Sequence, residues 1–325
     1  MSSAQHTEII GPNPRIIFMG SPEFAVASLD ALVTAGFNIV AVITAPDKPA
    51  GRGLQANSTA VKKYALARNL TILQPPKLKD PEFLASLKSL HADLQVVVAF
   101  RMLPEHVWSM PLMGTINLHA SLLPQYRGAA PINWTIINGE KETGLTTFRL
   151  KQEIDTGNIL LQEKLSIGPE ENAGHLHERM KNAGAALVVK TIRSLISGNL
   201  KEIPQSEAIS GSGTKLHLAP KINSSTSEID WAIQGNRIHN LIRGLSPYPG
   251  ANTMLNSKMF KILRSSFEPG NPEIIPGSIQ TDGKNFLRFA CADGFISCLE
   301  VQLEGKRRMN IEEFLRGYRL SPTGN

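Results

Sequence analysis

The chain has 325 residues, of which 42% are hydrophobic and 19% are charged. This composition is that of a globular protein long enough for two domains, and it excludes a disordered chain. No apolar run reaches the roughly 18 residues that a membrane-spanning helix needs, and residues 1–15 lack the hydrophobic region of a signal peptide. Cys291 and Cys298 fit neither a disulfide framework nor a metal-ligand spacing. We therefore expect a cytoplasmic protein with no membrane segment and no metal.

The net charge is +6, and residues 1–205 and 206–325 each contribute +3. Positive charge is therefore denser in the second part, which is the shorter one. Such a surface is compatible with a polyanionic partner such as a nucleic acid, although many basic enzymes bind none.

The first part of the chain alternates apolar runs with amphipathic segments. Strands are predicted at residues 16–19, 38–44, 71–73 and 94–100, and helices at about 22–35, up to 68, and 81–90. Ser21 is expected to cap the first helix. The repeated units predict an α/β fold with a Rossmann-like, doubly wound, mostly parallel sheet, whose ligands bind beyond the carboxyl ends of the strands. Neither a dinucleotide-binding glycine motif nor a phosphate-binding loop is present, which argues against nicotinamide and ATP chemistry.

The second part of the chain changes character. Strands are predicted at 143–150 and 159–167, and a helix from about 173 to 197. Residues 198–214 are rich in Gly, Ser and polar side chains, which is typical of a linker. Beyond one helix around 233–243, short β-like segments between Gly/Pro turns predict a small β-barrel. We therefore predict domains at 1–205 and 215–325, joined by a linker at about 198–214.

The stretch Thr115–Pro131 carries the clearest chemical pattern. An aliphatic run breaks there into a loop that contains Pro and Gly. Asn117 and His119 lie two residues apart, so on an extended chain their side chains point to the same side. A carboxamide and an imidazole on one face suit a reaction that develops negative charge on an oxygen. Taken alone, such a pair more often only satisfies backbone groups at the end of a strand.

The wider pattern resembles the 10-formyltetrahydrofolate-dependent formyltransferases. It consists of Asn117-x-His119-x-Ser121-Leu-Leu-Pro124 with the turn Asp155-Thr-Gly157. Other segments resemble the members of this family that act on methionyl-tRNA, and the resemblance covers nearly the whole chain from Arg15: Gly20–Phe24, Pro46–Gly53, Gln74-Pro75, Gly128–Ile132, Ile229–Trp231 and Arg243–Gly250. The resemblance implies a formyltransferase fold followed by an OB-like β-barrel domain.

The resemblance also implies an enzyme of translation initiation. It would transfer a formyl group from 10-formyltetrahydrofolate to the α-amino group of methionyl initiator tRNA. Asn117, His119 and Asp155 would be catalytic. Donors from Asn117 and His119 to the oxyanion are typically worth about 2.7–4 kcal/mol each. Asp155 would orient the imidazole and move a proton, directly or through water, which contributes roughly 10²–10⁴ in rate.

Binding residues follow from the same resemblance. The loop of Ser121, Leu122, Leu123 and Pro124 would contact the folate donor. Arg52 and Lys48 lie in a segment rich in Pro and Gly that would reach the tRNA, although its composition alone indicates an ordinary surface loop. In the C-terminal part, basic side chains are candidate phosphate contacts: Arg237, Arg243, Lys258, Lys261, Arg264, Lys306, Arg307 and Arg308.

One position departs from the family pattern. Phe100-Arg101 stands where the family more usually has Tyr-Gly, at the end of a predicted central strand. Arg101 could reach toward the glutamate tail of the folate or point to solvent, and the residues alone leave both possibilities open.

Two other functions compete with formylation of tRNA. A formyltransferase for a small amine, such as a sugar nucleotide or a purine precursor, would share the catalytic residues but would have no use for the Arg52 loop and the basic barrel. A non-catalytic binding module would not need Asn117, His119 and Asp155 together. We expect a monomeric enzyme that uses no metal.

Overall fold

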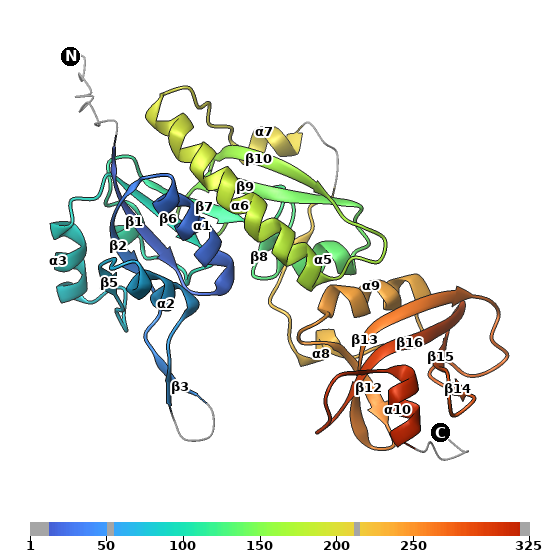
Figure 1. Cartoon of the computed structure of the whole chain (residues 1–325). Helices are drawn as coiled ribbons and strands as arrows, with labels where there is room; N and C mark the ends of the chain where they lie inside the picture. The colour runs from blue at the N-terminus through green and yellow to red at the C-terminus, as the bar shows by residue number, and fades with distance from the viewer. Residues whose placement is uncertain (1–12, 51–54, 211–214, 319–325) are drawn as a thin grey trace. The chain divides into compact units, whose positions relative to one another are not determined.

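The computed structural model describes residues 13–50, 55–210 and 215–318 (Figure 1). Its first sheet has seven strands in the order β10-β9-β7-β6-β1-β2-β5. The strands are β1 (Arg15–Gly20), β2 (Asn38–Ile43), β5 (Ile72–Leu73), β6 (Leu94–Val98), β7 (Thr115–His119), β9 (Glu142–Arg149) and β10 (Ile159–Ser166). From β7 to β5 all pairs are parallel, whereas β9 runs antiparallel to β7. The predicted mostly parallel sheet is therefore confirmed.

Helices cover both faces of this sheet, which explains why its central strands are apolar throughout. On one face, α1 (Glu23–Thr34) lies beside α6 (Ala173–Ile196), and α6 packs so closely on β7 that a Cβ at Gly184 would lie 2.7 Å from Leu118. On the other face, α3 (Pro81–Ser89) and α4 (Glu105–Trp108) bury Phe83 and Val107 against Ile17 and Ile43. In the described part of the chain, no helix is long and apolar enough to cross a membrane.

Ser21 does not cap α1, contrary to the prediction. The helix begins at Glu23 after Pro22, which has no side-chain cap hydrogen bond. The Ser21 hydroxyl instead accepts hydrogen bonds from the Ala45 amide at 3.2 Å and from the Thr44 hydroxyl at 3.4 Å. Ser21 therefore joins the ends of β1 and β2, because the helix begins one residue later than predicted and Ser21 lies one residue before the cap position.

The segment that was expected to be a linker contains ordered structure. Ile203 forms an antiparallel bridge with Ile159, with hydrogen bonds of 2.8 and 2.9 Å in the two directions. Helix α7 (Gln205–Ser210) follows directly, and its first side chain, Gln205, is only 3% exposed. Part of this segment therefore packs against the strand at the edge of the sheet, while residues 211–214 lie outside the described residues.

The C-terminal part contains a six-stranded antiparallel sheet. The strands are β12 (Ala251–Leu255), β13 (Lys258–Pro269), β14 (Ile279–Thr281), β15 (Leu287–Cys291), β16 (Gly294–Leu303) and β17 (Met309–Asn310), flanked by α9 (Gly235–Leu245) and α10 (Ile311–Gly317). Register shifts between Ile262 and Ser265 mark bulges in β13, and bulges bend a strand. Phe260 and Phe289 lie in the core that this half-barrel forms with its two helices. The predicted small C-terminal β-barrel domain is confirmed, in the form of an antiparallel half-barrel.

Contacts along the chain divide it into two compact units that are not separated at a single point. The first comprises Met1–Arg127, Gly144–Lys164 and Glu178–Leu216, and the second comprises Gly128–Thr143, Leu165–His177 and His217–Asn325. The domain limits predicted from the sequence stay a prediction. The remaining elements are β3 (Lys48–Ala50), β4 (Gln55–Asn57), α2 (Ala60–Ala67), β8 (Arg127–Gly128), α5 (Pro131–Ile137), β11 (Leu218–Ala219) and α8 (Ser224–Ser227).

Candidate active site

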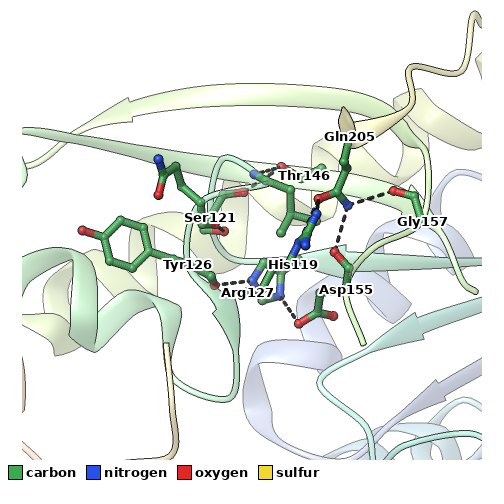
Figure 2. Close-up of polar contacts among 10 residues, drawn as sticks. His119, Ser121, Tyr126, Arg127, Thr146, Asp155, Gly157 and Gln205 are labelled. Atoms are coloured by element: carbon green, nitrogen blue, oxygen red, sulfur yellow. Dashed lines mark hydrogen bonds and ion pairs between the residues drawn. The ribbon is translucent and has the colours of Figure 1, made fainter. Parts of the chain in front are cut away.

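His119 is the last residue of β7, and the structure brings it next to Asp155 (Figure 2). The two side chains are 7% and 12% exposed, and 3.8 Å separates Nδ1 of His119 from Oδ2 of Asp155. This distance is too long for a hydrogen bond but short enough for a proton to be shared after a small movement, as is common in enzymes without substrate. The strand end and the distant Asp155-Thr-Gly157 turn therefore meet at one point.

The other imidazole nitrogen has a fixed partner. Nε2 of His119 lies 2.9 Å from the backbone carbonyl oxygen of Tyr126. Because a carbonyl oxygen can only accept a hydrogen bond, Nε2 carries a proton and Nδ1 of the neutral ring is left with its lone pair. The ring nitrogen that faces Asp155 is thus the one that can accept a proton.

Asn117 lies two residues before His119 on β7, so both side chains project from the same face of the sheet. Asn117 is half-buried, and its side chain makes no hydrogen bond to any residue that the structure describes. On the neighbouring strand β9, Phe148 stands opposite Asn117, and its ring packs at a right angle to the imidazole with a centroid distance of 6.5 Å. An amide with free donors therefore stands beside an imidazole held in place by packing.

The loop Ser121–Pro124 is held mainly by bonds within the protein. The Ser121 hydroxyl donates to the carbonyl of Gln125 at 2.6 Å. Thr146 donates to the Ser121 carbonyl at 2.7 Å and accepts from the Leu123 amide at 3.0 Å. Gln162 donates to the Leu123 carbonyl at 2.9 Å. The side chain of Ser121 is fully buried, so its hydroxyl shapes the loop, and the folate contact of Ser121, Leu122, Leu123 and Pro124 stays a prediction.

Three non-glycine residues around the site adopt left-handed backbone conformations. Their φ angles are 47° at Ala99, which follows β6, 58° at Tyr126 and 54° at Asp155. Such conformations cost on the order of 1–3 kcal/mol each and persist only where the surroundings impose them. Tyr126 and Asp155 are the two residues that approach the nitrogens of His119, so both partners of the imidazole have strained backbones.

Lys48 lies on another part of the first unit. It is exposed at the start of β3, in a hairpin with β4 that extends away from the sheet (Figure 1). Asp47 anchors the base of this hairpin, because Lys62 donates to its carboxylate at 2.5 Å and Gln74 at 2.9 Å. These hydrogen bonds, first that from Lys62, hold the pKa of Asp47 below its usual value. Arg52 lies outside the described residues.

Arg101 is exposed at the end of the segment that follows β6, and its possible reach toward the folate stays a prediction. Its guanidinium donates to the backbone carbonyls of Pro75 and Pro76, the second at 2.9 Å. The loop after β5 is therefore fastened to the loop after β6. The exposed side chain thus links two loops at the carboxyl edge of the sheet.

The basic candidates of the C-terminal part differ in their environments. Arg243 is only 8% exposed and donates to the carbonyls of Gly168 and Glu171, so it is a structural residue and its candidacy as a phosphate contact is wrong. Arg308 pairs with Glu300, and Arg307 pairs with Glu313. The remaining candidates are exposed or half-buried on the surface of this unit: Arg237, Lys258, Lys261, Arg264 and Lys306.

Several residues of the site were missed by the sequence analysis. Tyr126 acts through its backbone carbonyl, which leaves no signal in the choice of side chain. Thr146 and Gln205 are polar side chains that become buried only through tertiary packing. Among the residues that the structure describes, no group of three or more His, Cys, Asp or Glu side chains is arranged to hold a metal ion.

The solved structures that this chain resembles share its fold. The N-formyltransferase from Helicobacter canadensis, in complex with folinic acid and dTDP-3-aminofucose, matches with a TM-score of 0.64 and 21% identity, over 91% of this chain and 100% of that one. HypX from Aquifex aeolicus, in complex with tetrahydrofolic acid, matches with a TM-score of 0.62 and 16% identity, over 96% of this chain and 49% of that one.

Sequence comparison gives a closer relationship. The methionyl-tRNA formyltransferase of Bacteroides fragilis is 51% identical over 313 residues, which cover 94% of this chain and 96% of the relative. That of Flavobacterium johnsoniae is 49% identical over 311 residues, or 94% and 97% of the two chains. The formyl transferase family model matches residues 14–192, and the model of the formyl transferase C-terminal domain matches residues 221–319. The chain therefore belongs to the formyl transferase family.

Proposed function

We propose that this chain transfers the formyl group of 10-formyltetrahydrofolate to the α-amino group of methionyl initiator tRNA. The observation that carries the proposal is the pairing of His119 with Asp155, beside the amide of Asn117, which has no hydrogen-bond partner among the described residues. It occurs in a chain that is about half identical, over 94% of its length, to a relative named methionyl-tRNA formyltransferase. The product, N-formylmethionyl-tRNA, would serve translation initiation.

The proton of the attacking amine is the first chemical requirement. As the nitrogen of the amine bonds to the formyl carbon, it becomes acidic and must lose a proton. Nδ1 of His119 is suited to accept it, because Nε2 is already committed to the carbonyl of Tyr126. The carboxylate of Asp155, 3.8 Å from Nδ1, stabilises the resulting imidazolium and takes part in passing the proton on, directly or through water.

The charge that develops on the formyl oxygen is the second requirement. The amide of Asn117 can donate a hydrogen bond to this oxygen, and protonated His119 can add a second donor from the same face of β7. When the bond from the formyl carbon to the folate nitrogen breaks, that nitrogen must receive a proton, which the His119–Asp155 pair can return. The formyl carbon thus exchanges its bond to the folate nitrogen for a bond to the amine nitrogen, and the proton that leaves the amine is returned to the folate nitrogen.

The donor and the conditions of action complete the proposal. We place the folate at the carboxyl edge of the sheet, against the loop of Ser121, Leu122, Leu123 and Pro124, and expect no metal to take part. We further expect a monomer that acts in the cytoplasm. Size-exclusion chromatography with light scattering checks the oligomeric state.

A direct assay decides among the possible acceptors. Purified protein is incubated with radiolabelled 10-formyltetrahydrofolate and, in separate reactions, methionyl initiator tRNA, an amino-sugar nucleotide and a purine-precursor amine. We expect formylation of the charged tRNA and none of the small amines. Transfer to a small amine at a higher kcat/KM than to the tRNA would instead identify the rival formyltransferase, and transfer to no amine would favour a binding module.

The side chain of Arg52 gives a separate prediction about the tRNA. Arg52→Ala should raise the KM for methionyl initiator tRNA while leaving the KM for the folate unchanged. If Arg52 contacts a phosphate, the slope of log(kcat/KM) against log salt concentration should shrink by roughly 1. Lys88→Ala serves as the control, because Lys88 is an exposed lysine on α3, outside both the segment of residues 48–52 and the basic C-terminal part. Equal losses toward tRNA and folate would contradict a role for Arg52 in tRNA binding.

A further inference from the structure

Gln205 is a buried glutamine whose entire hydrogen-bonding capacity is used around the candidate active site (Figure 2). Its Nε2 donates to the backbone carbonyls of Asp155 and Gly157, both at 2.8 Å. Its Oε1 accepts from Nε of Arg127 at 3.0 Å and from Nη2 of the same guanidinium at 2.6 Å. An amide has two donor hydrogens and two acceptor lone pairs, so no part of this side chain is left over.

The two bonds from Nε2 hold the turn that carries Asp155. The backbone of Asp155 has a φ of 54°, which a non-glycine residue rarely adopts unless its neighbours impose it. Gln205 donates one hydrogen bond to the carbonyl of Asp155 itself and another to the carbonyl of Gly157, two residues later. The direction in which the carboxylate of Asp155 points is therefore tied to Gln205.

The bonds to Oε1 connect the same glutamine to the other side of the imidazole. Arg127 directly follows Tyr126, whose carbonyl oxygen lies 2.9 Å from Nε2 of His119. These contacts form a closed circuit. His119 bonds the carbonyl of Tyr126, the next residue Arg127 bonds Gln205, and Gln205 bonds the backbone of Asp155, whose carboxylate faces His119. One side chain thus touches both segments that position the imidazole, although it comes from the segment after α6 that has the composition of a linker.

We propose that Gln205 is a positioning residue for formyl transfer, which holds the Asp155 carboxylate and the His119 imidazole in their productive arrangement. The proposal rests on the catalytic roles proposed above for these two residues. Gln205 does not touch the reacting atoms itself. Its contribution should therefore appear in kcat and leave the binding of both substrates unchanged.

Three substitutions separate the parts of this circuit. Gln205→Met keeps the length of the side chain but removes all four hydrogen bonds. Gln205→Glu keeps the acceptor for Arg127 and replaces the donor to Asp155 and Gly157 with a carboxylate oxygen. Arg127→Met leaves both bonds to the turn in place and removes only the link toward Tyr126. The matched control is Glu207→Ala, because Glu207 is exposed in the same helix.

Steady-state kinetics with methionyl initiator tRNA and 10-formyltetrahydrofolate provide the test. Displacement of catalytic groups by about 1 Å can cost about 10²-fold in rate, so we expect Gln205→Met to lower kcat by roughly that factor. Both KM values should stay within about twofold of the wild type, because binding is not the step affected. Gln205→Glu should lose as much as Gln205→Met, and Glu207→Ala should match the wild type. A wild-type kcat in folded Gln205→Glu overturns the proposal.

The kcat of Arg127→Met gives a second test of the circuit, which can be made even if Gln205→Met fails to fold. Arg127→Met should lower kcat about tenfold at unchanged KM, as expected for loss of orientation. Where Gln205→Met folds, the double variant should be no worse than Gln205→Met alone, because the two residues act through one contact. An Arg127→Met enzyme with wild-type kcat, or strictly additive losses in the double variant, would disprove the circuit.

The variant Asp155→Asn distinguishes a failure of this proposal from a failure of the proposed function. If Asp155→Asn loses turnover while folded Gln205→Met and Gln205→Glu do not, the role of Gln205 is wrong and the role of Asp155 stands. If Asp155→Asn retains the wild-type kcat, the catalytic role of Asp155 fails, and the proposal for Gln205 fails with it.

Discussion

Replacement of His119 by alanine is expected to lower the kcat of formyl transfer by roughly 10²–10⁴-fold, the usual contribution of a positioned acid–base group. The substitution removes Nδ1, which faces Asp155, and also the donor to the Tyr126 carbonyl. The lost hydrogen bond can cost about 1–3 kcal/mol of stability if that carbonyl is left without a partner. Activity and thermal unfolding must therefore be measured together.

His119→Gln separates these two effects. The amide of glutamine can still donate a hydrogen bond to the Tyr126 carbonyl, but it cannot accept and release a proton at neutral pH. We expect this variant to recover stability and to remain as slow as His119→Ala. His106→Ala is the control, because His106 is exposed on α4 and should be dispensable. Wild-type turnover in His119→Gln would exclude proton transfer by this residue.

Asn117→Ala and Asp155→Ala should each lower kcat about as much as His119→Ala does, for different reasons. Asn117→Ala removes a donor proposed for the formyl oxygen, which is worth about 2.7–4 kcal/mol of transition-state stabilisation. Asp155→Ala removes the carboxylate that stabilises the imidazolium. Both variants should fold, because neither side chain lies in the hydrophobic core. A folded variant with wild-type turnover would remove its residue from the mechanism.

The parts of the fold that are governed by local patterns could be predicted from the sequence. Continuous apolar runs indicated central strands, and β6 is indeed buried at every position because helices cover both faces of the sheet. The two-residue spacing of Asn117 and His119 placed both side chains on one face of β7, since side-chain direction alternates along a strand. The meeting of Asp155 with His119 came from family resemblance, because local patterns do not indicate which turn approaches a strand end.

The other contacts around the site depend on tertiary packing, which the amino-acid composition of a segment does not indicate. Residues 198–214 have the composition of a linker, yet Gln205 is buried because its amide fits between two turns far away in the sequence. Arg101 and Arg243 were considered as ligand contacts because they are cations. The buried guanidinium of Arg243 satisfies backbone carbonyls instead, and the exposed guanidinium of Arg101 donates to the carbonyls of Pro75 and Pro76. A single arginine has five donors, so the sequence does not show whether they serve the protein or a ligand.

The position of the turn that carries Asp155 also depends on Gly157, where the backbone passes very close to β9. A Cβ atom at Gly157 would lie 1.5 Å from the carbonyl oxygen of Arg149 and 3.3 Å from the ring of Phe148. The first contact is with backbone, so no rotation of a side chain can relieve it. The amide of Arg149 is also bonded to the carbonyl of Asn158 at 2.9 Å, which keeps the turn pressed against this strand.

Gly157→Ala should therefore displace the turn and Asp155 with it. We expect a loss of about 1–3 kcal/mol in the free energy of unfolding, as for other overpacked sites, and a fall in kcat of about 10²-fold as the carboxylate moves from the imidazole. Chemical denaturation and steady-state kinetics measure the two effects. Gly270→Ala is the control, because a Cβ there meets no atom within 4 Å. Unchanged stability and turnover in Gly157→Ala would show that the turn tolerates displacement, and that the position of Asp155 does not limit the reaction.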